Sequence, residues 1–121
     1  GTVLLVEDEE VVRLPAREIL RTCGYTVIEA RHGKEALLLS EAHPGKIDLA
    51  LTDVVMPKMD GLELANRLQS MRPDTRILFM SGYTDSEIGR IDNPENGIAF
   101  IQKPFTAEAL SCKVREILDA S

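Results

Sequence analysis

The feature that most constrains the fold is an alternation of short apolar runs with longer amphipathic segments. The runs are too short for independent helices and are typical of strands covered on both faces. The longer segments have helical spacing of apolar residues. We predict strands at 3–6, 25–29, 49–53, 75–80 and 98–102, and helices at 12–23, 33–42, 60–71, 85–91 and 106–118. This order favours an α/β fold with a parallel five-stranded sheet and helices on both faces, in a single domain spanning residues 1–121.

Four of the predicted strands end in polar side chains, which are Glu7 and Asp8, Asp53, Ser81 and Lys103 in chain order. The carboxyl ends of parallel strands meet at one edge of the sheet, where open α/β sheets bind their ligands. The sequence therefore predicts an acidic pocket that also contains one hydroxyl and one ammonium group.

Three carboxylates without a cysteine or histidine form a hard oxygen site, which suits Mg²⁺ or Mn²⁺. Lys103 and Ser81 are natural partners for phosphate oxygens, and phosphoryl transfer requires mainly positioning and charge neutralisation. Asp53 heads a sharp turn and is the candidate nucleophile, because carboxylates form aspartyl-phosphate intermediates. The alternative is a buried structural Asp that only caps the turn.

Composition narrows the classes of function. The 121 residues are 44% hydrophobic, and no apolar run approaches the roughly 20 residues that span a bilayer. The net charge of −6 comes without a basic stripe, so we expect no direct contact with nucleic acid and none with a membrane. Cys23 and Cys112 suggest core-edge thiols on apolar helix faces in a reducing cytoplasm. His32 and His43 lack metal-ligand spacing, so we expect solvated surface residues.

Three positions predict how helices begin or break. Pro15 interrupts the first helical pattern, so we expect a kink or a late helix start. Asp60 and Glu63 have capping-box spacing, which predicts a helix running to about residue 71. Thr106 is expected to cap the last helix.

Four motifs, VLLVEDE, LTDVVMPKMDG, MSGYTD and FIQKPF, resemble in sequence and spacing those of the receiver domain of two-component response regulators. The resemblance covers essentially the entire chain. It implies a flavodoxin-like (βα)5 three-layer sandwich with strand order 2-1-3-4-5.

The resemblance also implies a division of roles at the acidic pocket. Asp53 would accept a phosphoryl group from a phosphohistidine. Asp8, Asp53 and the backbone carbonyl of Val55 would bind Mg²⁺, with Glu7 as an outer-shell acid. Lys103 would contact the phosphate.

A second group of residues would transmit the signal. Ser81 resembles the switch hydroxyl and Phe100 the switch aromatic. Val55 and Tyr83 flank the phosphorylation site at positions that vary in the family, and we expect them to tune the lifetime of the phosphoryl group. The Lys103–Pro104 peptide bond is commonly cis in such domains.

The implied partner is a histidine kinase or a phosphotransfer domain, in the cytoplasm or on the cytoplasmic part of a membrane-bound sensor kinase. SGYTD and QKPF resemble receivers at the carboxyl end of hybrid histidine kinases, and the start at Gly1 suggests a domain excised from a longer chain. A stand-alone regulator, a regulator separated from a DNA-binding domain, and a weak dimer remain open.

Two other classes of protein compete with this interpretation. A haloacid-dehalogenase-like phosphatase also uses an Asp nucleophile with Mg²⁺, but it needs a second Asp two residues later, where this chain has Val55. A pseudo-receiver that acts only as an interaction module would lack a key acid or the lysine, and none is missing here.

Overall fold

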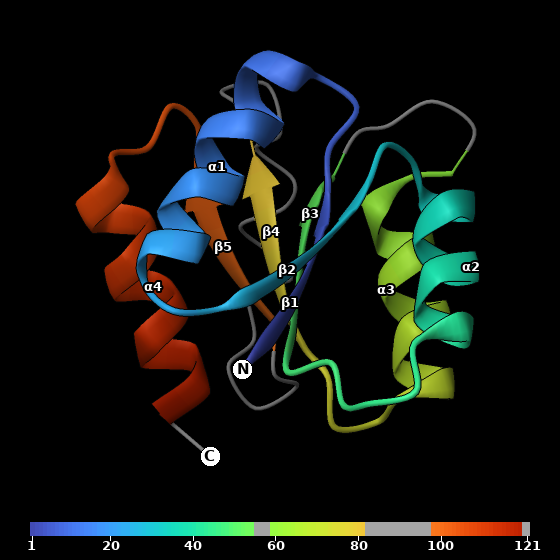
Figure 1. The fold of residues 1–121 in the computed structure, drawn as a ribbon. Coiled ribbons are helices and arrows are strands. Elements are labelled where there is room, and N and C mark those ends of the chain that lie inside the picture. The colour runs from blue at the N-terminus through green and yellow to red at the C-terminus, as the bar shows by residue number, and fades with distance from the viewer. Residues whose placement is uncertain (55–58, 82–97, 120–121) are drawn as a thin grey trace.

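The computed structural model describes residues 1–54, 59–81 and 98–119. Within these ranges the chain forms five strands and four helices (Figure 1). In chain order they are β1 (Thr2–Val6), α1 (Glu10–Thr22), β2 (Thr26–Ala30), α2 (Gly33–Ala42), β3 (Leu49–Asp53), α3 (Gly61–Met71), β4 (Arg76–Ser81), β5 (Ile98–Gln102) and α4 (Ala107–Asp119). The predicted short helix at 85–91 lies outside the described residues.

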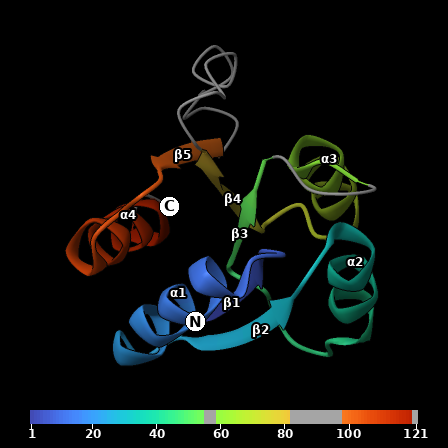
Figure 2. The ribbon, with the colours of Figure 1, turned by 90° about the horizontal axis from the view of Figure 1, so that it is seen from above.

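The five strands form one parallel sheet in the order β2-β1-β3-β4-β5, which confirms the predicted topology. Helices α1 and α4 cover one face and α2 and α3 cover the other, so the fold has three layers (Figure 2). All five residues of β3 are buried, because it is the central strand and both of its faces are covered. The edge strand β2 is less buried, as its mixed polar and apolar sequence predicts.

Each face of the sheet has its own hydrophobic core. Alternate side chains of a strand point to opposite faces, so Leu4 and Val6 of β1 pack toward α2 and α3, whereas Val3 and Leu5 pack toward α1 and α4. The apolar runs of the sequence are continuous because both sets of alternate residues are buried. No helix in the described ranges is long and apolar enough to cross a bilayer.

The predicted helix caps are confirmed. The Asp60 side chain accepts a hydrogen bond from the Glu63 amide at 2.8 Å, and α3 follows from Gly61 to Met71. The Thr106 hydroxyl accepts one from the Ala109 amide at 3.0 Å at the start of α4.

Of the two effects predicted for Pro15, a kink or a late helix start, the late start does not occur, because α1 begins at Glu10 and contains Pro15. The kink stays a prediction. The amides of Val12 and Arg13 already bond to the Glu9 carbonyl, which establishes the helix before the proline. Pro15 has no N–H to donate to the Val11 carbonyl, but both residues are exposed, so water can supply the donor.

The cysteines and histidines also depart from their predictions. Cys23 and Cys112 are exposed and do not lie at the edge of the core, since Cys23 follows the last turn of α1 and Cys112 lies on the outer side of α4. His32 is half-buried and caps α2, because its Nδ1 accepts a hydrogen bond from the Glu35 amide at 3.1 Å. His43 is half-buried too.

Candidate functional site

The candidate site lies at the edge of the sheet where β1, β3 and β5 end. Glu7 and Asp8 follow β1 directly, Asp53 is the last residue of β3, and Lys103 follows β5. Because the strands are parallel and in register, residues separated by up to 96 positions in the sequence meet here. The structure thus brings together the acids and the lysine that the strand ends predict.

Glu7, Asp8 and Asp53 form one acidic cluster, in which one carboxylate oxygen of each lies within 4.8 Å of the others. Glu7 and Asp53 are buried residues, with exposed fractions of 0% and 6%, whereas Asp8 is exposed. The cluster is therefore open to solvent on the side of Asp8 and closed on the side of the sheet.

Lys103 supplies the positive charge that this cluster requires. Its Nζ lies 3.0 Å from Asp53 Oδ2 and 3.2 Å from Glu7 Oε2. Burial lowers the pKa of Lys103, but the hydrogen bond to Asp53 and the charges of Glu7 and Asp53 together raise it above its usual value. The lysine is therefore held as an ammonium group between the two buried acids.

Glu7 is the acid whose ionisation is most affected. Burial is the largest cause of the increase of its pKa from 4.5 to about 7, and the negative charge of Asp53 and a hydrogen bond with Asp8 add to it. A hydrogen bond from the Glu9 amide and the charge of Lys103 act in the opposite direction. Three ionised carboxylates so close together repel one another, and a cation between them would reduce this repulsion.

The donor set of this cluster fits a divalent cation that prefers oxygen. Carboxylates from Glu7, Asp8 and Asp53 converge, one side is open for water or another ligand, and no cysteine or histidine belongs to the cluster within the described ranges. Mg²⁺ and Mn²⁺ accept such ligands, whereas zinc sites usually contain Cys or His. The predicted carbonyl ligand, Val55, lies outside the described residues.

The backbone around Asp53 is fixed by the close approach of α3. The Gly61 amide donates to the Val54 carbonyl at 2.7 Å, and a Cβ on Gly61 would collide with the Asp53 carbonyl oxygen. The Thr52 hydroxyl donates a hydrogen bond to the Asp53 carbonyl at 3.0 Å. Only glycine lets the helix begin so near the strand end, which accounts for Gly61 in the predicted turn.

Ser81 and Phe100 lie on the neighbouring strands. Ser81 ends β4 and is half-buried, and its carbonyl accepts a hydrogen bond from the Lys103 amide at 2.7 Å. The half-buried ring of Phe100 stacks on Phe79, with centroids 5.3 Å apart and an interplanar angle of 28°. The Lys103–Pro104 peptide bond is cis. Tyr83 lies outside the described residues.

Sequence reasoning missed Arg13 of α1, whose Nη1 donates to the Glu7 carbonyl at 2.9 Å. An arginine on an amphipathic helix is ordinarily solvated, so its type alone gives no signal. The one available signal was its spacing of four residues from Arg17, which places two guanidinium groups on the same side of α1.

Comparison with known proteins gives consistent matches over the whole fold. The family model for the response regulator receiver domain matches residues 3–115. The chain is 42% identical over 119 residues to the sensor kinase CckA of Brucella abortus, an alignment covering 98% of this chain and 13% of CckA. It is 31% identical over 119 residues to the response regulator receiver protein CpdR of the same species, with 98% of both chains covered.

A solved structure, the receiver domain from the hybrid histidine kinase CckA, has a TM-score of 0.82 at 34% identity and covers 98% of this chain and 99% of that one. Some curated relatives are much longer than the aligned part. The chain spans 13% of the Brucella CckA and 31% of a cyclic di-GMP phosphodiesterase of Thermotoga maritima, to which it is 35% identical.

Proposed function

This chain belongs to the family of response regulator receiver domains of two-component signalling, and from that premise we propose that Asp53 is its phosphoacceptor. The observation that carries the proposal is the position of Asp53. It is a buried carboxylate at the end of the central strand, within one cluster with Glu7 and Asp8 and 3.0 Å from the Lys103 ammonium.

In the proposed reaction, a carboxylate oxygen of Asp53 attacks the phosphorus of a phosphohistidine. A bond from phosphorus to the Asp53 oxygen forms, the phosphorus–nitrogen bond breaks, and its electron pair stays on the imidazole nitrogen. Lys103, which neutralises Asp53 before the reaction, is near enough to turn its ammonium group to an oxygen of the incoming phosphoryl group. Ser81, at the end of the adjacent strand, would donate its hydroxyl to another of these oxygens.

Receiver domains bind Mg²⁺ through acidic residues, and this chain has such a cluster. We assign Asp8, Asp53 and the Val55 carbonyl as the residues that would hold Mg²⁺ or Mn²⁺, with Glu7 in the outer shell. The cation would neutralise the clustered acids and the negative charge of the phosphoryl group.

Receiver domains of two-component systems interact with histidine kinases or phosphotransfer partners. The similarity to receivers of CckA supports an origin for this segment in a hybrid histidine kinase, with a phosphohistidine of the kinase or of a phosphotransfer domain as the donor. The family match does not favour a haloacid-dehalogenase-like phosphatase, nor does the complete set of acids and lysine favour a pseudo-receiver.

The test is intact-mass spectrometry after incubation with Mg²⁺ and acetyl phosphate, a small phosphodonor. Wild type should gain one phosphoryl group and Asp53→Asn none. Asp74→Asn is the matched control, because Asp74 is exposed on a turn far from the cluster, and it should behave as wild type. Modification of Asp53→Asn at the wild-type level, or modification of wild type without a divalent cation, would refute the proposal.

A further inference from the structure

Arg13 is a charged residue in an unusually buried place. Its side chain is only 6% exposed. Arg13 lies in the first half of α1, beside the acidic cluster. Its Nη1 donates to the Glu7 carbonyl at 2.9 Å, and its Nε lies 3.3 Å from Glu29 Oε1 on β2. Its Nη2 lies 3.5 Å from Glu10 Oε1. All three nitrogens of the guanidinium therefore have partners.

The Glu7 carbonyl belongs to the peptide unit that joins Glu7 to Asp8. This unit lies in the turn between β1 and α1, and its orientation affects the direction of the Glu7 and Asp8 side chains. Arg13 holds the oxygen of the unit, while the Glu7 amide is bonded to the Ala30 carbonyl at 3.0 Å. Rotation of the peptide plane would move the Asp8 carboxylate relative to Asp53, so the hydrogen bond from Arg13 restrains the geometry of the cluster.

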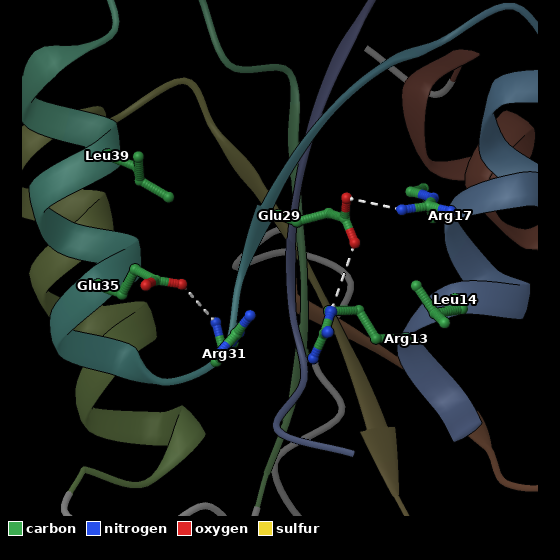
Figure 3. A pocket seen from close by; sticks show the side chains of 7 residues that line it. All are labelled: Arg13, Leu14, Arg17, Glu29, Arg31, Glu35 and Leu39. Carbon is green, nitrogen blue, oxygen red and sulfur yellow. Dashed lines mark hydrogen bonds and ion pairs between the residues drawn. The ribbon is translucent and has the colours of Figure 1, made fainter. Parts of the chain in front are cut away.

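Glu29 in turn holds Arg13. Figure 3 shows the Glu29 carboxylate between two arginines of α1, with one oxygen toward Arg13 and the other toward Arg17, whose Nη1 lies 3.2 Å away. A buried guanidinium without a counter-charge would be unfavourable, and Glu29 supplies that charge from the edge strand. Glu29 of β2 thus holds Arg13 of α1, and Arg13 in turn holds the Glu7 carbonyl beside the acidic cluster.

We propose that Arg13, oriented by Glu29, is a positioning residue that fixes the Glu7–Asp8 peptide unit and thereby raises the affinity of the acidic cluster for a divalent cation. The inference rests on the proposed function, because it takes this cluster as the cation site. Arg13 contacts the Glu7 carbonyl, Glu10 and Glu29, so it would act on the cation only through the peptide unit. Residues that orient metal ligands from outside the ligand set commonly change affinity by about 10- to 100-fold when mutated.

Arg17 provides a matched control for Arg13. Both arginines pair with Glu29, but only Arg13 contacts the Glu7 carbonyl. Both arginines line an open pocket of about 450 Å³ between α1, β2 and α2, and the Nε of Arg17 has no hydrogen-bond partner in the described ranges. Replacement by methionine keeps the aliphatic stem in both cases and removes the guanidinium.

The experiment is a Mg²⁺ titration of the unphosphorylated protein, followed by amide chemical shifts. Arg13→Met should raise the Mg²⁺ Kd by about 10-fold, whereas Arg17→Met should keep the wild-type value. In the metal-free protein, the amide nitrogen of Asp8, which shares the peptide unit with the Glu7 carbonyl, should shift in Arg13→Met and stay unchanged in Arg17→Met. Wild-type affinity in Arg13→Met, or an equal loss in both variants, would overturn the inference.

If Arg13→Met does not fold, Glu29→Gln replaces it in the test. That change keeps Arg13 and removes the charge that orients it, so it should raise the Kd above the value shared by wild type and Arg17→Met. A wild-type Kd in Glu29→Gln would then overturn the inference. Failure of the proposed function has a different signature, since wild type itself would show no Mg²⁺-dependent shifts at Asp8 and Asp53.

Discussion

Glu7 makes the stability of the metal-free protein depend on pH. Its pKa is about 7 in the folded chain, because burial penalises the charged form, against 4.5 for the ordinary side chain. The folded state therefore binds the proton more tightly than the unfolded state. This contribution to stability is fully present below pH 4.5 and is lost as the pH rises through about 7. Since one pKa unit corresponds to about 1.4 kcal/mol, we expect a decrease in the unfolding free energy on the order of 3 kcal/mol across that window.

Urea unfolding with a chelator present, at several pH values in this window, measures the effect. Glu7→Gln is uncharged throughout, so its unfolding free energy should change less with pH than that of wild type. Addition of Mg²⁺ should reduce the pH dependence of wild type, because a cation at the cluster favours the ionised acid. Identical pH profiles for wild type and Glu7→Gln would contradict this prediction.

The members of the acidic cluster could be predicted from the sequence, because each one lies at the end of an apolar run or within two residues after it. Which acid is fully buried could not be predicted, since Glu7 and Asp8 are adjacent and differ only in the direction the backbone gives them. The hydrogen bond from Arg13 could not be predicted from the sequence either, because it depends on the distance in space between α1 and the end of β1.

Arg72 donates hydrogen bonds to the carboxyl end of α2, although it lies about thirty residues later in the sequence. It is the residue after α3, and its guanidinium donates to the Ser40 hydroxyl at 3.0 Å and to the carbonyls of Ser40, His43 and Gly45 at 2.7 Å each. The last carbonyls of a helix have no partner within the helix, and a cation is favourable there. The loop after α2 is thereby tied to α3.

We expect Arg72→Met to lower the free energy of unfolding by about 2 kcal/mol, because several charge-assisted hydrogen bonds are lost at once. Arg67→Met is the control, since its ion pair with Glu63 is exposed and should contribute no more than about 0.5 kcal/mol. Urea unfolding at constant pH compares the two variants with wild type. Equal unfolding free energies for the two variants would show that the contacts of Arg72 with the end of α2 do not stabilise the fold.

The existence and order of the strands and of four helices could be predicted, because buried strands and amphipathic helices have distinct periodicities. The caps by Asp60 and Thr106 are local and could be predicted as well. The cap by His32 has the same local geometry, but histidine is not among the residues that most commonly cap helices. Arg72 reaches a helix about thirty residues away, so local patterns carry no information about it.

β4 and β5 extend the sheet from β3, which carries Asp53, to the edge strand β5. Ser81 ends one of these strands, Phe100 lies in the other, and the Lys103 amide bonds to the Ser81 carbonyl. A phosphoryl group on Asp53 would offer the Ser81 hydroxyl a new acceptor. The resulting movement of Ser81 would leave volume for the Phe100 ring to turn inward, which biases an equilibrium between two conformations.

Ser81→Ala should therefore still be phosphorylated but show smaller chemical-shift changes than wild type in residues 82–102. The change removes only the hydroxyl, so the backbone bond from Lys103 to the Ser81 carbonyl is kept. Shift changes of wild-type size in phosphorylated Ser81→Ala would exclude coupling through this hydroxyl.

The proposed site of the phosphoryl group is Asp53, and chemical trapping can locate that group in the sequence. Borohydride reduces an acyl phosphate of aspartate to homoserine, which peptide mass spectrometry can assign to one position. After treatment with Mg²⁺ and acetyl phosphate, homoserine should be found at position 53, and its formation should stop when the cation is removed by a chelator. Homoserine at position 8, or at another acidic position in place of 53, would show that Asp53 is not the phosphoacceptor.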